Sequence, residues 1–285
     1  MKLVCFNHGG EIHYGALKGA KVVDLSARLG GMYPDIVAFI AKDGLPIARR
    51  VVESEPGDFD YAALDLAPVV PNPGKILCVG LNYHDHVNEA NRKAPELPMI
   101  FPRWPESLTA HNKPIMRPKA SDKLDWEAEL LVVIGKPTGR YLPMEKTLEH
   151  VFGYSCLNEA CLRDYQRHSS QIGPGKNFEK TGATGPWLVT ADEIPDPMKL
   201  DIKMTLNGEV MQHANTSQMI HSIQATIEYI TRWTPLKAGD LIATGTMGGV
   251  GFARTPPIFM KPGDIAEIII EGVGTLHNTI EDERL

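Results

Sequence analysis

Two glutamates, separated by a single alanine, stand at the start of an apolar segment. Glu127 and Glu129 lie in the stretch 125–129, and the residues that follow, up to Gly135, are apolar and largely β-branched. Such a run predicts a buried strand, on which residues two apart point to the same face. Two carboxylates held together near a core repel each other and lose hydration, and a hard divalent cation removes both costs. The alternative is one solvated glutamate and one paired with Arg or Lys.

A second group of polar side chains follows the strand predicted at Lys75–Val79. His86 and Glu89 are three residues apart, so on a helical turn their side chains are neighbours. A carboxylate beside an imidazole fixes its tautomer and raises its basicity, which suits removal of a proton from water. The segment could instead be a helix N-terminus with solvated polar residues, and His84 is the second choice for a base.

Two glycine-rich segments allow the backbone to come close to a ligand. Lys176 follows Gly173-Pro174-Gly175, and a lysine beside a divalent cation can stabilise an oxyanion or hold a carboxylate. The second segment, Gly245–Gly251, has four glycines in seven residues and predicts a turn whose amides approach an anion. It lacks the Lys-Ser/Thr pair that ends a phosphate-binding P-loop.

Strands must position most of these side chains, because strand-like runs outnumber helical ones. Lys2–His8 and Ile12–Leu17, separated by Gly9-Gly10, predict a β-hairpin, and a strand and a helix are expected over 22–25 and 32–40. The clearest helix is Met219–Trp233, in which isoleucines repeat on one stripe. Further strands are predicted at Lys75–Val79, Glu129–Ile134, Gly185–Val189, Lys199–Leu206, Asp240–Ala243, Ile265–Ile270 and Gly274–Thr279.

Many strands, few helices and frequent Gly and Pro turns indicate a β-rich α+β fold and not a doubly wound α/β sheet. The breaker run Pro71-Asn72-Pro73-Gly74 is the clearest interruption of the pattern. We therefore predict a small N-terminal α+β domain over residues 1–70 and a larger catalytic domain over 71–285.

Composition excludes several classes of function. The 285 residues carry a net charge of -6, which argues against nucleic acid or an anionic membrane as a partner. We expect no signal peptide and no membrane span, because no apolar run is long enough. The four cysteines show no CxxC pairing, which favours reduced, buried thiols and a cytoplasmic protein.

Nine short segments, in this order, resemble the fumarylacetoacetate hydrolase family, and the resemblance runs from about Lys75 to Thr279. They are Cys78-Val79-Gly80-Leu81-Asn82-Tyr83 followed by His86, Asp125-Trp126-Glu127-Ala128-Glu129-Leu130, Gly153-Tyr154-Ser155, Arg163-Asp164-Tyr165-Gln166, Gly175-Lys176-Asn177-Phe178, Gly185-Pro186-Trp187, Asn207-Gly208-Glu209, Asn215-Thr216-Ser217 and Gly245-Thr246-Met247-Gly248-Gly249-Val250-Gly251. Each segment is short, and their order makes the resemblance specific.

The resemblance implies a mixed β-roll-like catalytic domain with Mg²⁺ or Mn²⁺, or alternatively Ca²⁺, held by Glu127, Glu129 and Glu159. The family usually has Asp where this chain has Glu159, and small residues where it has Cys161 and Leu162. The extra methylene moves the carboxylate outward by about one bond, so metal preference and substrate are open. The alternative for Glu159 is a surface position on a following helix.

The resemblance also implies roles for other side chains. The catalytic residues that it implies are His86, Glu89 and Lys176, and the substrate-binding residues are Arg103, Thr246 and Tyr83. Arg103 stands where many relatives have Lys, and its guanidinium offers a bidentate fork for a carboxylate. The residue after Thr246 is Met247, where the family usually has Pro.

The reaction implied is metal-dependent hydrolysis of a C–C bond in an acylpyruvate or a related diketo-acid. The alternative is an isomerase or decarboxylase of a 2-oxo acid from aromatic catabolism, which uses the same metal and enolate chemistry without an attacking water. A third hypothesis is a binding protein that has lost turnover through the change at Glu159. We expect a cytoplasmic homodimer whose ligand is a small oxo-acid.

Overall fold

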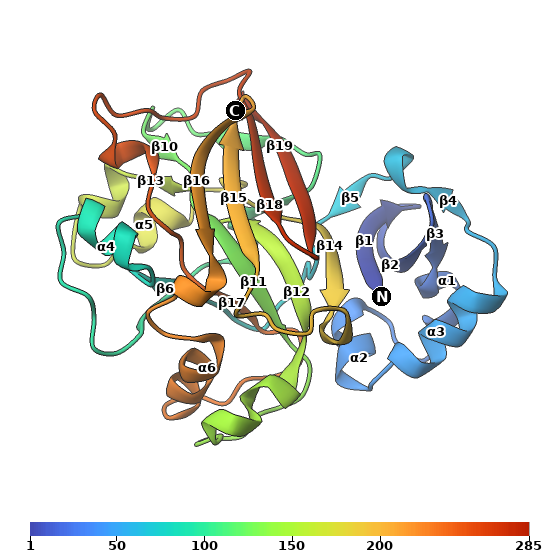
Figure 1. Cartoon of the computed structure of the whole chain (residues 1–285). Coiled ribbons are helices and arrows are strands. Elements are labelled where there is room, and N and C mark those ends of the chain that lie inside the picture. Colours follow the sequence, from blue (N-terminus) through green and yellow to red (C-terminus); the bar gives the residue numbers. More distant parts are fainter. Residues whose placement is uncertain (285) are drawn as a thin grey trace.

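A twelve-stranded mixed sheet runs through the computed structural model, which describes residues 1–284. Its main order is β4-β3-β2-β1-β14-β12-β11-β17-β6-β7, with β5 beside β1 and β8 beside β14 (Figure 1). The strands are β1 (Lys2–His8), β2 (Glu11–Lys18), β3 (Lys21–Asp24), β4 (Phe59–Asp60), β5 (Leu66–Ala67), β6 (Ile76–Gly80), β7 (Met99–Pro102), β8 (Leu108–Ala110), β11 (Ala128–Ile134), β12 (Val151–Asn158), β14 (Gly182–Thr190) and β17 (Leu241–Ala243).

A five-stranded sheet of order β16-β15-β18-β19-β9 packs on the central strands of the first sheet. Its strands are β9 (Ile115–Arg117), β15 (Asp201–Leu206), β16 (Glu209–Asn215), β18 (Ile265–Ile270) and β19 (Gly274–Asp282), and a separate pair joins β10 (Leu124–Asp125) to β13 (Cys161–Leu162). Leu130 and Val132 of β11 share one apolar cluster with Met204 of β15 and Ile268 of β18. The main core therefore lies between the two sheets.

Helices are short and lie around these sheets. They are α1 (Leu25–Leu29), α2 (Ile36–Ala41), α3 (Leu45–Ser54), α4 (His84–Glu89), α5 (Gly173–Lys176) and α6 (Ile223–Thr231), with 3₁₀ turns at Tyr61–Ala63, Pro105–Ser107, Met144–His150, Tyr165–Arg167, Ala191–Glu193, Thr216–Gln218 and Gly251–Ala253. The helix predicted from Met219 begins at Ile223, because Ser222 caps it by accepting the Ala225 N–H at 3.2 Å. Asp35 caps α2 in the same way, so that helix begins four residues after the predicted start at residue 32.

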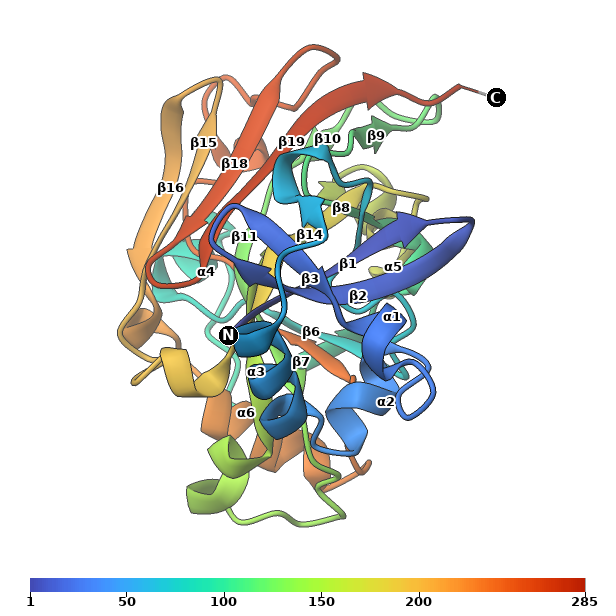
Figure 2. The same cartoon turned by 90° about the vertical axis from the view of Figure 1, so that its right-hand side faces the viewer.

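The predicted hairpin is confirmed, since β1 and β2 pair antiparallel from Leu3 opposite Ala16 to His8 opposite Glu11. Helices α1, α2 and α3 lie on one face of this hairpin (Figure 2). Strand β1 also pairs with β14, with Leu3 opposite Leu188. The predicted domain boundary near residue 70 stays a prediction. The predicted β-rich α+β class is confirmed by the strand-dominated architecture.

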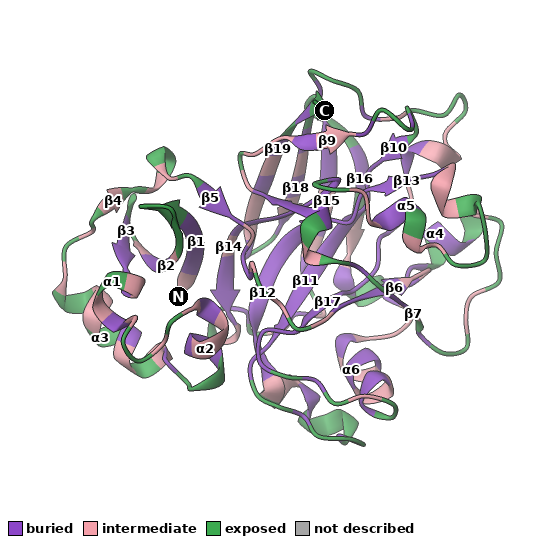
Figure 3. Ribbon diagram, turned by 180° about the vertical axis from the view of Figure 1, so that it is seen from behind, coloured by how far each residue is buried: buried purple, intermediate pink, exposed green. Residues whose placement is uncertain are grey.

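Strand β11 is buried along its whole length, as are its neighbour β12 and most of β14 (Figure 3). It lies between β12 and β17 in the sheet. Leu130 and Val132 pack toward the five-stranded sheet, whereas Leu131 and Val133 pack toward the cluster that contains α1 and α2. Burial of both faces explains the continuous apolar run, in which polar residues do not alternate.

All four cysteines are buried and free, as the sequence predicts. Burial raises the pKa of the Cys156 thiol to about 12 and that of Cys161 to about 11, so both are neutral at physiological pH. No helix among residues 1–284 is long and apolar enough to cross a membrane.

Candidate active site

Three carboxylates meet at one end of the strand pair β11–β12. Glu127 precedes β11, Glu129 lies on it, and Glu159 follows β12. The antiparallel register places Glu129 opposite Leu157, and the Glu159 N–H donates to the Glu127 carbonyl at 2.8 Å. All three side chains are buried, and one oxygen from each lies within 4.8 Å of the others. Glu159 is therefore part of this cluster and not a surface residue of a helix.

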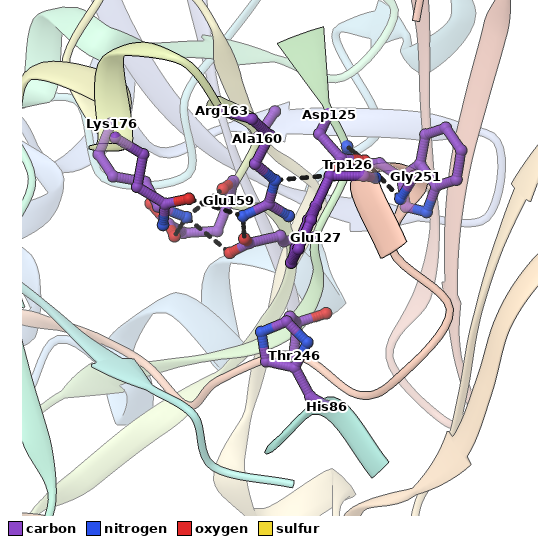
Figure 4. Close-up of polar contacts among 12 residues, drawn as sticks. His86, Asp125, Trp126, Glu127, Glu159, Ala160, Arg163, Lys176, Thr246 and Gly251 are labelled. Atoms are coloured by element: carbon purple, nitrogen blue, oxygen red, sulfur yellow. Dashed lines mark hydrogen bonds and ion pairs between the residues drawn. The ribbon is translucent and has the colours of Figure 1, made fainter. Parts of the chain in front are cut away.

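Lys176 places an ammonium group among these carboxylates (Figure 4). Its Nζ lies 2.6 Å from Glu127 Oε2, 3.2 Å from the Glu159 carbonyl oxygen, and in contact with the Glu159 carboxylate. Burial by itself would lower the pKa of Lys176, but Glu127 and Glu159 raise it above its usual value. Lys176 is therefore a fixed positive charge. Gly175 permits this approach, since a Cβ there would lie 2.5 Å from the Gln166 amide nitrogen.

Arg103 lies beneath the cluster, at the end of β7. Its Nη1 donates to Glu159 Oε1 at 2.6 Å and its Nε to Ser107 Oγ at 2.8 Å, while Nη2 donates to Thr181 Oγ1 at 3.3 Å. A Cβ at Gly182 would lie 2.4 Å from Nη2, so the glycine leaves room for the guanidinium. Arg103 is buried and does not line the cavity described below. In this structure it orients Glu159, whereas the sequence predicted that it binds substrate.

Asp125 and Arg163 connect the cluster to the glycine-rich segment. Arg163 donates from Nε to Asp125 at 2.7 Å and pairs through Nη1 with Glu127 at 2.6 Å. The same Asp125 carboxylate accepts the amides of Gly251 at 2.7 Å and Phe252 at 3.0 Å. Asp125 was not predicted as a site residue, although residues two apart in an extended chain point to the same side and Asp125 stands two residues before Glu127.

The buried charges of the site do not balance. They are four carboxylates, on Asp125, Glu127, Glu129 and Glu159, and three cations, on Arg103, Arg163 and Lys176, which leaves one net negative charge. Glu129 has no ion pair with any residue from 1 to 284 and accepts the Gly245 N–H at 2.7 Å. Burial, and next Glu159 and Glu127, raise the pKa of Glu129 well above its usual value.

A divalent cation fits this site. Oxygen donors from three carboxylates suit Mg²⁺, Mn²⁺ or Ca²⁺, and each carboxylate has about four acceptor positions, so the existing bonds leave room for coordination. The cation would supply the positive charge that Glu129 lacks. In contrast, Lys176 and Arg163 already oppose the effect of burial at Glu127 and hold the pKa of that carboxyl below its usual range.

His86 and Glu89 form a pair on α4. His86 Nδ1 lies 2.7 Å from Glu89 Oε1, and the other Glu89 oxygen accepts the Gly249 N–H at 2.7 Å. Glu89 therefore ties α4 to the glycine-rich segment while it orients the imidazole. His84, the second choice for a base, is exposed on the same helix.

The glycine-rich segment borders the carboxylates on the side of α4. Gly245 has φ +97°, and a Cβ there would lie 2.5 Å from the Asn82 Cβ, so only glycine fits without movement. Thr246 Oγ1 accepts from Gln212 Nε2 at 2.8 Å, and its own hydroxyl donates only to the Met247 sulfur at 3.9 Å, a weak acceptor that a ligand oxygen would displace. Tyr83 is buried and does not line the cavity, and its hydroxyl has no hydrogen-bond partner among residues 1–284.

One small cavity of about 60 Å³ collects these groups. Glu127, Glu129 and Lys176 line it, and His86 and Thr246 face them across it (Figure 4). Its remaining walls are mostly apolar, from Val79, Leu81, Met99, Phe101 and Ile172. The structure thus brings together five of the residues that the sequence singled out. Glu159 and Glu89 do not line the cavity, but they contact Lys176 and His86, which do.

An acidic cluster and a His–Glu pair face one cavity on a β-rich α+β domain, which is the arrangement expected of an enzyme active site. Residues 75–281 match the family described as Fumarylacetoacetate (FAA) hydrolase C-terminal. The chain belongs to the fumarylacetoacetate hydrolase family, whose similar members include hydrolases, isomerases and tautomerases.

Three relatives illustrate this range. A mitochondrial oxaloacetate tautomerase of Rattus norvegicus is 35% identical over 287 residues, which cover 98% of this chain and 91% of the relative. The structure of a fumarylacetoacetate hydrolase from Exiguobacterium antarcticum matches with a TM-score of 0.82 and 31% identity, covering 99% of this chain and all of the other. A maleylpyruvate hydrolase from Sphingobium sp. SYK-6, in complex with manganese(II) and pyruvate, matches with a TM-score of 0.82 and 28% identity over both whole chains.

Glu129→Gln tests the metal centre. The amide keeps the shape but removes the carboxylate of the cluster that forms no ion pair within residues 1–284, so we expect Mn²⁺ affinity to fall by at least about tenfold. Isothermal titration calorimetry measures this change, and Glu145→Gln on the surface is the matched control. Wild-type Mn²⁺ affinity in Glu129→Gln would remove Glu129 from the ligand set.

Glu159→Asp tests whether the site is built around the longer side chain. Shortening it draws the carboxylate away from Arg103 Nη1 and Lys176 Nζ and leaves these buried cations poorly paired. We expect weaker Mn²⁺ binding, by about tenfold, together with a lower unfolding temperature, measured by calorimetric titration and thermal unfolding. Glu145→Asp controls for the loss of a methylene. Equal or tighter Mn²⁺ binding by Glu159→Asp would contradict this view.

Proposed function

We propose that this protein is a divalent-metal-dependent hydrolase that cleaves a C–C bond in an acylpyruvate or a related diketo-acid. The observation that carries this proposal is the His86–Glu89 pair, which faces Glu127 and Glu129 across one cavity. A base oriented by a carboxylate and placed against a candidate cation site is what water-mediated cleavage requires. The similarity to a maleylpyruvate hydrolase with manganese(II) and pyruvate supports the same reaction class.

Glu127, Glu129 and Glu159 would hold the cation. When bound, a divalent cation supplies Lewis acidity that polarises a substrate carbonyl. Lys176 remains protonated beside Glu127 and Glu159 and adds a second fixed positive charge for the oxygen that becomes negative. The hydroxyl of Thr246, which accepts from Gln212, donates to the substrate carboxylate.

His86 moves the proton. Its Nδ1–H donates to Glu89, so the lone pair of Nε2 accepts a proton from water. The water oxygen forms a bond to the carbonyl carbon of the acyl group, and the C–C bond to the 2-oxo-acid fragment breaks. The electron pair of that bond leaves with the 2-oxo-acid fragment as an enolate, which then takes up the proton.

A tautomerase is the second candidate, because an oxaloacetate tautomerase is 35% identical over nearly the whole chain. In this reaction His86 would take a proton from the carbon beside the keto group and return it to the enol, and no water would attack. An isomerase or decarboxylase of a 2-oxo acid from aromatic catabolism would use the same groups. The homodimer and the cytoplasmic location also stay predictions.

Labelled water distinguishes these reactions. We expect that the Mn²⁺-loaded protein, given acetylpyruvate in H₂¹⁸O, releases acetate with one ¹⁸O atom in its new carboxylate, as measured by mass spectrometry. Proton exchange or enol–keto conversion of oxaloacetate, without any cleavage of acylpyruvates, would contradict the proposed hydrolase activity and support the tautomerase activity.

His86→Ala tests the base. We expect turnover to fall by about 10²–10⁴-fold, the usual size of a general-base contribution, while Mn²⁺ affinity stays at the wild-type value. Steady-state kinetics and calorimetric titration measure the two quantities, and His84→Ala is the control on the same helix. Wild-type turnover in His86→Ala, or its loss in His84→Ala, would move the base away from His86.

A further inference from the structure

The small cavity continues outward into a larger chamber of about 540 Å³. The two spaces share five lining residues, namely Leu81, His86, Met99, Gln166 and Ile172. A ligand whose reacting end lies between His86 and the carboxylates therefore extends into this outer chamber. Its walls decide which substituent is accepted at the far end of that ligand.

The outer chamber is cationic. Three arginines line it, Arg92, Arg163 and Arg167, and no carboxylate does. Arg163 is already paired with Asp125 and Glu127. By contrast, neither Arg92 nor Arg167 forms a salt bridge within residues 1–284. Two guanidinium groups thus border this space with their charges uncompensated, beside the exposed Ser169 and Ser170.

Arg167 is held by an aromatic ring. Its guanidinium lies 5.0 Å from the centroid of the Phe252 ring, and that of Arg163 lies 4.5 Å from the same centroid. The Phe252 amide in turn donates to Asp125 at 3.0 Å, so the ring is tied to the buried charge network. Cation–π contact restricts an otherwise flexible side chain, which reduces the entropy lost when it binds an anion.

Arg92 belongs to a different wall of the chamber. It lies three residues after the end of α4, and its backbone N–H donates to the Val87 carbonyl at 3.0 Å. Three carboxylates lie near it along the chain, and none of them neutralises its charge in the chamber, because Asp85 and Glu96 do not line this space and Glu89 is bound to His86 and Gly249. An anion between Arg92 and Arg167 would therefore bridge the segment that carries His86 to the segment that carries Arg163.

We propose that the outer chamber is a subsite for a second carboxylate, held by Arg92 and Arg167, and that the substrates are 2-oxo acids with an anionic group at the far end. Leu81, Met99, Ile172 and Phe252 supply apolar contacts for the carbon chain between the two ends. The subsite deepens the proposed function, on which it rests only for the orientation of the reacting end.

Binding of a matched pair of ligands tests this subsite without turnover. The Mn²⁺-loaded protein is titrated with 2-oxohexanedioate and with 2-oxohexanoate, which differ in the terminal carboxylate. We expect the dioate to bind at least about tenfold more tightly, the usual effect of one hydrogen-bonded charge pair. Raising the salt concentration should reduce this ratio, because both arginines are exposed.

Variants assign the effect to the two arginines. Arg92→Gln and Arg167→Gln should each lower the ratio of the two affinities, and the double variant should bring it to within about twofold of one. Arg167→Lys keeps the charge and should retain part of the ratio. Arg50→Gln is the control and should show the wild-type ratio, because Arg50 is an exposed residue of α3 that forms no ion pair within residues 1–284.

The subsite would be overturned by a ratio near one in the wild-type protein or by a wild-type ratio in the double variant. It would also be overturned if neither of the two 2-oxo acids bound to the Mn²⁺-loaded protein. The cleavage assay in labelled water reports on the reaction separately. If acylpyruvates are cleaved but the ratio of the two affinities is near one, only the subsite proposal is wrong. If the ratio is high but no cleavage occurs, only the proposed hydrolase activity is wrong.

Discussion

The site depends on the contact between the Lys176 ammonium and the carboxylates of Glu127 and Glu159. Burial would drive these acids toward the neutral form, and their mutual repulsion adds to that tendency. Removing the ammonium would break two buried ion pairs and leave Glu127 and Glu159 with one cation each, and breaking a buried pair typically costs about 3–5 kcal/mol. Arg103 and Arg163 pair with the remaining oxygens of the same two residues, so three cations from separate segments fix the cluster. Glu129 is left without such a partner, and this imbalance favours a divalent cation.

The same network fixes the position of the glycine-rich segment that borders the carboxylates. Asp125 accepts the amides of Gly251 and Phe252, and Glu89 accepts the amide of Gly249. Two carboxylates, one from the sheet and one from α4, therefore fix neighbouring residues of one glycine-rich segment. Movement of α4 would change the position of His86 and the support of this segment together. His86 and the glycine-rich segment are thus coupled mechanically, which suits an enzyme that must assemble its groups around a ligand.

Local periodicity was enough to predict part of this site and of the fold. Alternation along a strand placed Glu127 beside Glu129, and helical spacing placed His86 beside Glu89. The hairpin and most strands followed from apolar runs between glycines. Strand β12 and helix α3 were not predicted. Gly153, Ser155 and Cys156 interrupt the apolar pattern of β12, and its burial comes from β11 and β14, which are paired with it on both sides.

What could not be predicted was the set of partners that meet only in the folded chain. Arg103 is 56 residues from Glu159, and Asp125 is 126 residues from Gly251. A side chain's type shows what it can bind, but not whether the fold has already supplied a partner. The guanidinium of Arg103 can bind a carboxylate through two N–H groups, and the carboxylate that it binds is that of Glu159 in the same protein. Arg167 has the same fork and finds no internal carboxylate within residues 1–284, so its charge is available to a ligand. The distinction between a structural and a recognition arginine therefore comes from the charge balance of the folded site, because the residue type is the same in both.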